Sequence, residues 1–134
     1  MSLVGTNDPV NEVAAAGRTL QFVCHKASLD AGWWNDYFVV EGMPRVRKAF
    51  VAEKLALIHT EISEATEGVR KNKMDDHLPH RKSVEVELAD AVIRIADLAG
   101  ALELDLGAAI AEKMAYNAVC PDHKLPGRQR PSSP

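Results

Sequence analysis

The chain has 134 residues and a net charge of −3; apolar residues make up 46% of it and aromatic residues 5%. This length suits one domain with a core that needs no disulfide bridges. The balanced charge excludes the basic stripe that duplex nucleic acid requires, and no apolar run approaches the ~20 residues of a membrane span. No signal-peptide pattern opens the chain, and its two cysteines lie far apart. We therefore expect a cytoplasmic protein without a nucleic-acid or membrane partner.

The first predicted helix begins near residue 8. Asp8 is a residue type that caps helices, Pro9 suits the first helical position, and Gly32 follows the expected end. Residues 31–45 contain both tryptophans and both flanking glycines. We expect these residues to form an ordered loop rather than a helix.

Three further helices are predicted after this loop. The second covers about residues 46–71, and a polar connection follows it. Pro79 or Ser83 opens the third helix, which continues to about Leu102. Asp105 is positioned to cap the fourth.

These elements predict an all-α fold in one domain, residues 1–124, followed by a loose tail at 125–134. Four helices with short connections favour a four-helix bundle. The tail is rich in proline and serine, which disfavour regular structure.

Each of the two central helices carries an apolar stripe. Successive stripe positions are three or four residues apart, the spacing of helices that pack on one another. In the second helix the stripe is Val51, Leu55, Ile58, Ile62, Ala65 and Val69, and in the third it is Val84, Leu88, Ala91, Ile95, Leu98 and Leu102.

Two pairs of acids accompany these stripes: Glu61 with Glu64, and Glu87 with Asp90. Each acid immediately precedes a stripe residue, so all four are rotated from their stripe by about 100° in the same sense. The pairs are also nearly equidistant from the polar connection. If the two helices are antiparallel, the four carboxylates lie level and on the same side of the hairpin.

Like charges this close repel, so the cluster indicates a bound cation. Oxygen ligands favour Mg²⁺, with Mn²⁺ as a substitute. Gly68 continues the acid side of the second helix and would leave space for a ligand. The alternative is that these acids are solvated and balanced by basic neighbours such as Arg94.

The acid pattern resembles that of the MazG-like nucleoside triphosphate pyrophosphohydrolases. The similarity covers roughly residues 33–124 and is densest in "EKLALIHTEISEATEGVRK", "EVELADAVIRIADLAG" and "LDLGAAIAEKMAYN". The resemblance implies Mg²⁺-dependent hydrolysis of a (deoxy)nucleoside triphosphate to the monophosphate and pyrophosphate, in nucleotide-pool housekeeping. It also implies a homodimer or homotetramer, in which a neighbouring chain contributes to the site.

The resemblance assigns the four acids as metal ligands. It places Lys113 and Asn117 near phosphate, and it implies that the loop containing Trp33 and Trp34 helps to hold the base. One of the two tryptophans is expected to stack on the base and the other to pack in the core.

From the chemistry of the residues, Glu61 is expected to bind the metal. Glu64 is the candidate to orient or deprotonate the attacking water, and Lys54 is positioned to offset phosphate charge. Where relatives commonly carry an arginine this chain has Cys120. That departure leaves two alternatives: a non-catalytic helical dimerisation or regulatory module with an acidic metal-binding cluster, or a metal-binding bundle without nucleotide activity.

Overall fold

A computed structural model describes residues 8–120. Those residues are all-α, as expected, and none of their helices combines the length and apolar character that crossing a bilayer requires. The predicted tail at 125–134 lies outside the described residues. The helices are α1 (Pro9–Asp30), α2 (Asn35–Val39), α3 (Pro44–Arg70), α4 (Ser83–Ala101) and α5 (Leu106–Val119).

The predicted helix starts are confirmed at both acidic caps. The Asp8 side chain accepts a hydrogen bond from the backbone N–H of Val10 at 3.1 Å. Asp105 accepts one from the N–H of Ala108 at 3.0 Å. Each carboxylate satisfies a backbone donor that would otherwise lack a partner in the first helical turn.

The prediction of a loop across residues 31–45 was wrong in one part, because α2 lies within it. This helix has only five residues and no side-chain cap. Such a short helix is not stable by itself. It forms because Tyr37 and the preceding Trp34 are buried against other helices.

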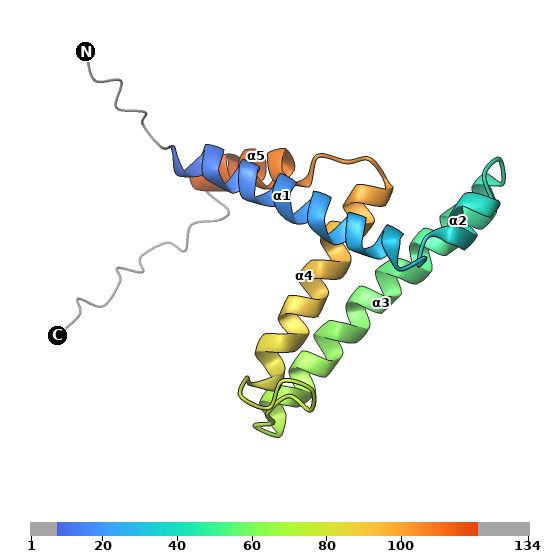
Figure 1. The fold of residues 1–134 in the computed structure, drawn as a ribbon. Coiled ribbons are helices and arrows are strands. Elements are labelled where there is room, and N and C mark those ends of the chain that lie inside the picture. The colour runs from blue at the N-terminus through green and yellow to red at the C-terminus, as the bar shows by residue number, and fades with distance from the viewer. Residues whose placement is uncertain (1–7, 121–134) are drawn as a thin grey trace, which may run out of the picture.

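The long helices form two antiparallel pairs (Figure 1). In one pair, α3 and α4 make a hairpin; in the other, α5 packs beside the N-terminal half of α1. Helix α1 also packs on α4, which joins the two pairs. Because α3 packs chiefly on α4, residues 8–120 of one chain do not form a closed four-helix bundle, and that architecture stays a prediction.

An aromatic core lies where α1 and α2 meet the α3–α4 hairpin. Trp34 is 1% exposed and packs edge-on against the ring of Tyr37, with ring centroids 5.3 Å apart. Its Nε1 donates to Asp97 at 2.8 Å, which satisfies the buried indole. Phe50 of α3 completes the group.

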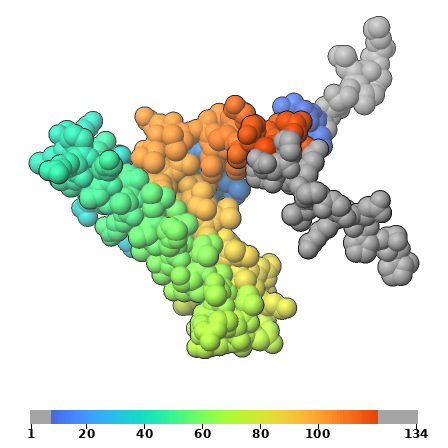
Figure 2. All heavy atoms as spheres, turned by 180° about the vertical axis from the view of Figure 1, so that it is seen from behind, coloured from blue at the N-terminus to red at the C-terminus, as the bar shows by residue number. Residues whose placement is uncertain are grey.

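The apolar stripes lie only partly in the core. Ala65, Ala91 and Leu98 are buried, and Val51, Ile58 and Leu102 pack against the core, whereas five other members of the stripes are exposed. Seen from behind, α3 lies at the surface along its length, and no other part of residues 8–120 covers it (Figure 2). We group the five exposed stripe residues with the neighbouring Val92 and call them the apolar face; it consists of Leu55 (48% exposed), Ile62 (46%), Val69 (63%), Leu88 (50%), Val92 (47%) and Ile95 (39%).

Candidate metal centre

The connection between α3 and α4 brings the two acid pairs to one level. Its ends are held by an antiparallel bridge between Met74 and Lys82. Within it, the buried side chain of Asp75 accepts hydrogen bonds from the N–H groups of His77 (2.9 Å) and Leu78 (2.7 Å). This closed turn makes the hairpin antiparallel, which is the condition under which the acid pairs were expected to lie level.

The structure brings three of the four predicted acids close together. One carboxylate oxygen each from Glu61, Glu87 and Asp90 lies within 4.8 Å of the other two. Glu61 is the most enclosed of the three; its side chain is 9% exposed. Glu64 is exposed and adjoins Glu87 from the outer side of α3. We call these four residues the acid cluster.

The buried side of the α3–α4 contact includes acids of this cluster. Glu61, Ala65 and Gly68 are the buried positions of α3, and Ala91 is buried on α4 beside Asp90. The α3–α4 interface therefore contains carboxylates where a purely structural hairpin would bury aliphatic side chains.

Repulsion within the cluster is visible in its acid–base properties. Burial, together with the neighbouring Glu61 and Glu64, raises the pKa of Glu87 to about 7. Burial and the charge of Glu61 also raise the pKa of Asp90, although Arg94 opposes this change. Both directions follow from bringing like charges together in a partly desolvated space.

From the sequence, Arg94 was expected only as a basic neighbour that balances the charge of the acids. In the structure its Nε donates to Oε1 of Glu61 at 2.6 Å, from α4 across to α3. The one sequence feature that could have identified Arg94 is its position four residues after Asp90. That spacing predicts an ion pair within α4, not one with α3. The actual partner depends on how the two helices are rotated against each other.

The expectation that Gly68 leaves space for a ligand was wrong. A Cβ at this position would lie 3.0 Å from Oγ and 3.1 Å from Cβ of Ser83. The glycine therefore permits the start of α4 to approach α3 closely.

The two tryptophans are separated by the fold. Trp34 is enclosed in the aromatic core and is therefore the packing member of the pair, which leaves it no part in base stacking. Trp33 is 68% exposed, and its role in holding the base stays a prediction. Lys54 of α3 lies above this core, with Nζ 4.9 Å from the Trp34 ring centroid. Lys54 precedes Glu61 by seven residues, which places both on one side of α3.

Lys113 and Asn117 lie on α5, beside α1 and away from the α3–α4 connection (Figure 1). Lys113 Nζ is 4.6 Å from the ring centroid of Tyr116. Oδ1 of Asn117 is buried and accepts no hydrogen bond from the described residues. The described chain thus does not bring these two residues to its own acid cluster.

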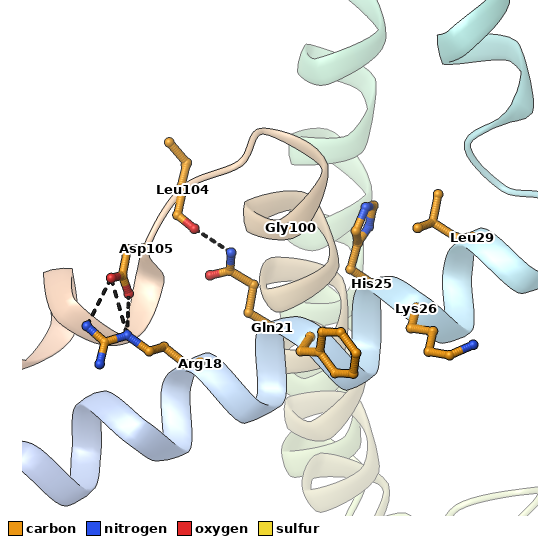
Figure 3. A pocket seen from close by; sticks show the side chains of 9 residues that line it. Arg18, Gln21, His25, Lys26, Leu29, Gly100, Leu104 and Asp105 are labelled. Atoms are coloured by element: carbon orange, nitrogen blue, oxygen red, sulfur yellow. Dashed lines mark hydrogen bonds and ion pairs between the residues drawn. The ribbon is translucent and has the colours of Figure 1, made fainter.

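A concavity of about 520 Å³ lies elsewhere, between α1 and the segment joining α4 to α5 (Figure 3). Its polar side chains are already paired: Arg18 with Asp105, Lys26 with Asp30, and His25 with Asp97. None of the four acids lines it. We therefore assign it no part in the candidate metal centre.

Comparisons of the chain with protein-family models, with curated proteins and with solved structures gave no match.

Proposed function

We propose that the chain is a Mg²⁺-dependent nucleoside triphosphate pyrophosphohydrolase, which releases a nucleoside monophosphate and pyrophosphate. The observation that carries this proposal is the group formed by Glu61, Glu87 and Asp90 inside a helix contact. Three carboxylates this close repel one another, and the ion pair with Arg94 offsets only part of their charge, so a bound cation would stabilise them. The divalent metal ion that accompanies a triphosphate is a ligand that such a group of carboxylates would bind.

The donor set fits Mg²⁺, and Mn²⁺ as its substitute. All the available ligand atoms are carboxylate oxygens, which hard divalent cations prefer, and no histidine or cysteine joins the group within the described residues. Glu61, Glu87 and Asp90 would hold the ion, with Glu64 beside them. A bound ion would neutralise phosphate charge and supply a water of lowered pKa.

The reaction requires a water oxygen to bond to the α-phosphorus while the bond to the bridging oxygen breaks. Glu64 is exposed and lies outside the group of three, so it is free to orient this water or accept its proton. Lys54, on the same side of α3 as Glu61, would offset the charge of the phosphates.

The apolar face supports the proposed homodimer or homotetramer. Six large aliphatic side chains lie exposed along the α3–α4 hairpin. Pairing two hairpins through this face would complete a four-helix bundle from two chains. A second chain is also the route by which Lys113, Asn117 and Trp33 would reach the phosphates and the base.

Two observations favour the alternative of a non-catalytic dimerisation or regulatory module. Arg94 already neutralises Glu61 without a metal, and the same apolar face would serve dimerisation alone. Such a module would form the same dimer but would not turn over a triphosphate.

The deciding experiment incubates the protein with Mg²⁺ and a panel of canonical and damaged nucleoside triphosphates. We expect monophosphate and pyrophosphate, and a loss of more than about 100-fold in rate for Glu61→Gln, because a ligand of the cation is removed. Glu85→Gln is the matched control, since Glu85 is an exposed acid of α4 paired with Arg81. Wild-type protein that folds and binds Mg²⁺ but hydrolyses no member of the panel would favour the non-catalytic module.

A further inference from the structure

The ion pair between Arg94 and Glu61 differs from the other ion pairs of residues 8–120. Its carboxylate is the most buried, with 9% of the Glu61 side chain exposed. It joins two helices, as the pair between His25 and Asp97 also does. By contrast, Lys26–Asp30 and Arg70–Glu67 each link neighbours on one helix and are well exposed. Surface pairs contribute little to stability, but an enclosed charge without a partner is costly. Arg94 therefore provides the counter-charge that Glu61 needs when no cation is present.

The same carboxylate is the most enclosed member of the proposed metal site. Its Oε1 accepts the short hydrogen bond from Arg94, and Glu61 belongs to the group with Glu87 and Asp90. A divalent cation and the guanidinium thus require the same negative charge. Binding of the cation weakens the attraction that holds Arg94 in place.

The exposure of the Arg94 side chain and its single hydrogen bond allow it to leave this position. Its side chain is 43% exposed, so the guanidinium reaches solvent when it releases Glu61. The contact through Nε uses only one of the five guanidinium donors. Guanidinium binds phosphate with the same fork of donors that it presents to carboxylate.

We propose that Arg94 is an exchangeable counter-cation: it neutralises Glu61 in the metal-free protein and transfers to the phosphates of the substrate when the metal binds. This inference rests on the proposed function. It makes Arg94 a substrate-binding residue whose position depends on the metal, so that the site acquires its phosphate-binding cation only after it has acquired its metal.

The test measures Mn²⁺ binding by calorimetry without any nucleotide. Arg94→Gln should bind Mn²⁺ about five- to tenfold more tightly than wild type, because the competing cation is gone. Arg81→Gln is the matched control: it removes the same charge from an exposed pair with Glu85 and should change Mn²⁺ affinity by less than about twofold. General damage to the fold would weaken Mn²⁺ binding and would not produce the tightening.

The second measurement titrates inorganic tripolyphosphate into each protein at saturating Mn²⁺; this probe presents phosphates without a base. Arg94→Gln should bind it at least about tenfold more weakly, since a charge-assisted hydrogen bond is lost. Arg94→Lys, which retains the charge but not the fork, should keep wild-type Mn²⁺ affinity and show an intermediate loss.

The outcomes separate this inference from the proposed function. Unchanged Mn²⁺ affinity in Arg94→Gln, with wild type binding normally, would show that Arg94 does not compete and would overturn the inference alone. Tighter Mn²⁺ binding with unchanged tripolyphosphate affinity would overturn the transfer to phosphate. Absence of Mn²⁺ binding in wild type, equal to that of Glu61→Gln, would overturn the metal site and the inference with it.

Discussion

The two antiparallel helix pairs of this chain, α1–α5 and α3–α4, differ in the residues that form their contacts. Helix α1 meets α5 backbone to backbone at Gly17 and Gly107. A Cβ on Gly107 would overlap the carbonyl oxygen of Ala14 and approach the N–H of Arg18. At this crossing point no side chain fits between the two backbones, and the ion pair between Arg18 and Asp105 lies beside it, so the contact is explained by close packing.

The α3–α4 pair instead encloses charged side chains in its contact. Glu61 is buried there with Glu87 and Asp90 beside it, while the apolar face points outward. A hairpin selected for stability alone would place the aliphatic residues inside and the acids outside. The comparison separates a contact made by close backbone packing from one that contains the acids of the proposed metal site.

The largest effect on stability is expected at the junction of the two pairs. Trp34→Ala should lower the free energy of unfolding by about 3–5 kcal/mol, because it leaves a cavity in the aromatic core. Trp34→Phe keeps most of the volume and loses the hydrogen bond to Asp97, which costs about 1–2 kcal/mol. Urea unfolding monitored by circular dichroism measures both; equal losses would mean that the hydrogen bond, not packing, dominates.

The apolar face provides the next test. Ile62→Glu should weaken the proposed homodimer by about 2–4 kcal/mol in association free energy, since a charge would enter an apolar interface. Light scattering coupled to size-exclusion chromatography follows the change in mass. Glu53→Gln, an exposed substitution elsewhere on α3, should leave the mass unchanged. A wild-type protein that is monomeric at all concentrations would contradict the proposed assembly.

Alanine at the two contact glycines compares the helix pairs directly. Gly107→Ala should destabilise the protein by about 1–3 kcal/mol, because the new methyl group meets rigid backbone of α1. Gly68→Ala should cost less: its methyl group would meet Ser83 at 3.0–3.1 Å, and the ~1 kcal/mol gained from helix propensity offsets the small shift needed. Thermal unfolding of both variants decides; a larger loss at Gly68 would show that α3–α4 is the less adaptable contact.

The smallest effect is the pH dependence of the metal-free protein. The folded-state pKa of Glu87 is raised from 4.5 to about 7, so the folded protein holds a proton that the unfolded chain has released between these values. The resulting stability is present below pH 4.5 and lost as the pH rises through about 7. Solvent screening limits it to about 1 kcal/mol.

Urea unfolding in a chelator at pH 5 and pH 8 measures this loss. Glu87→Gln should lose less stability between the two pH values than wild type, because its amide does not titrate. Added Mg²⁺ should restore wild-type stability most strongly at pH 8, where the carboxylates are ionised. An identical pH dependence in the variant would place the responsible group elsewhere.

Much of the local structure was readable from the sequence. Asp8, Pro9 and Asp105 marked helix starts because their effects on the backbone act within one turn. The hairpin and the shared level of the acid pairs followed from their equal distances from a polar connection. These features depend on helix periodicity, which a sequence expresses directly.

The tertiary structure decided which side of each helix is buried. The apolar stripes predicted that Ile62 and Leu88 would be buried, but both are exposed, and Glu61 is buried together with the small stripe residues Ala65 and Ala91. Periodicity defines positions around one helix axis, but the rotation of one helix against another depends on every contact that both make. For the same reason, α2, the burial of Trp34 and the pairing of Arg94 with Glu61 emerged only when all the helices were in place.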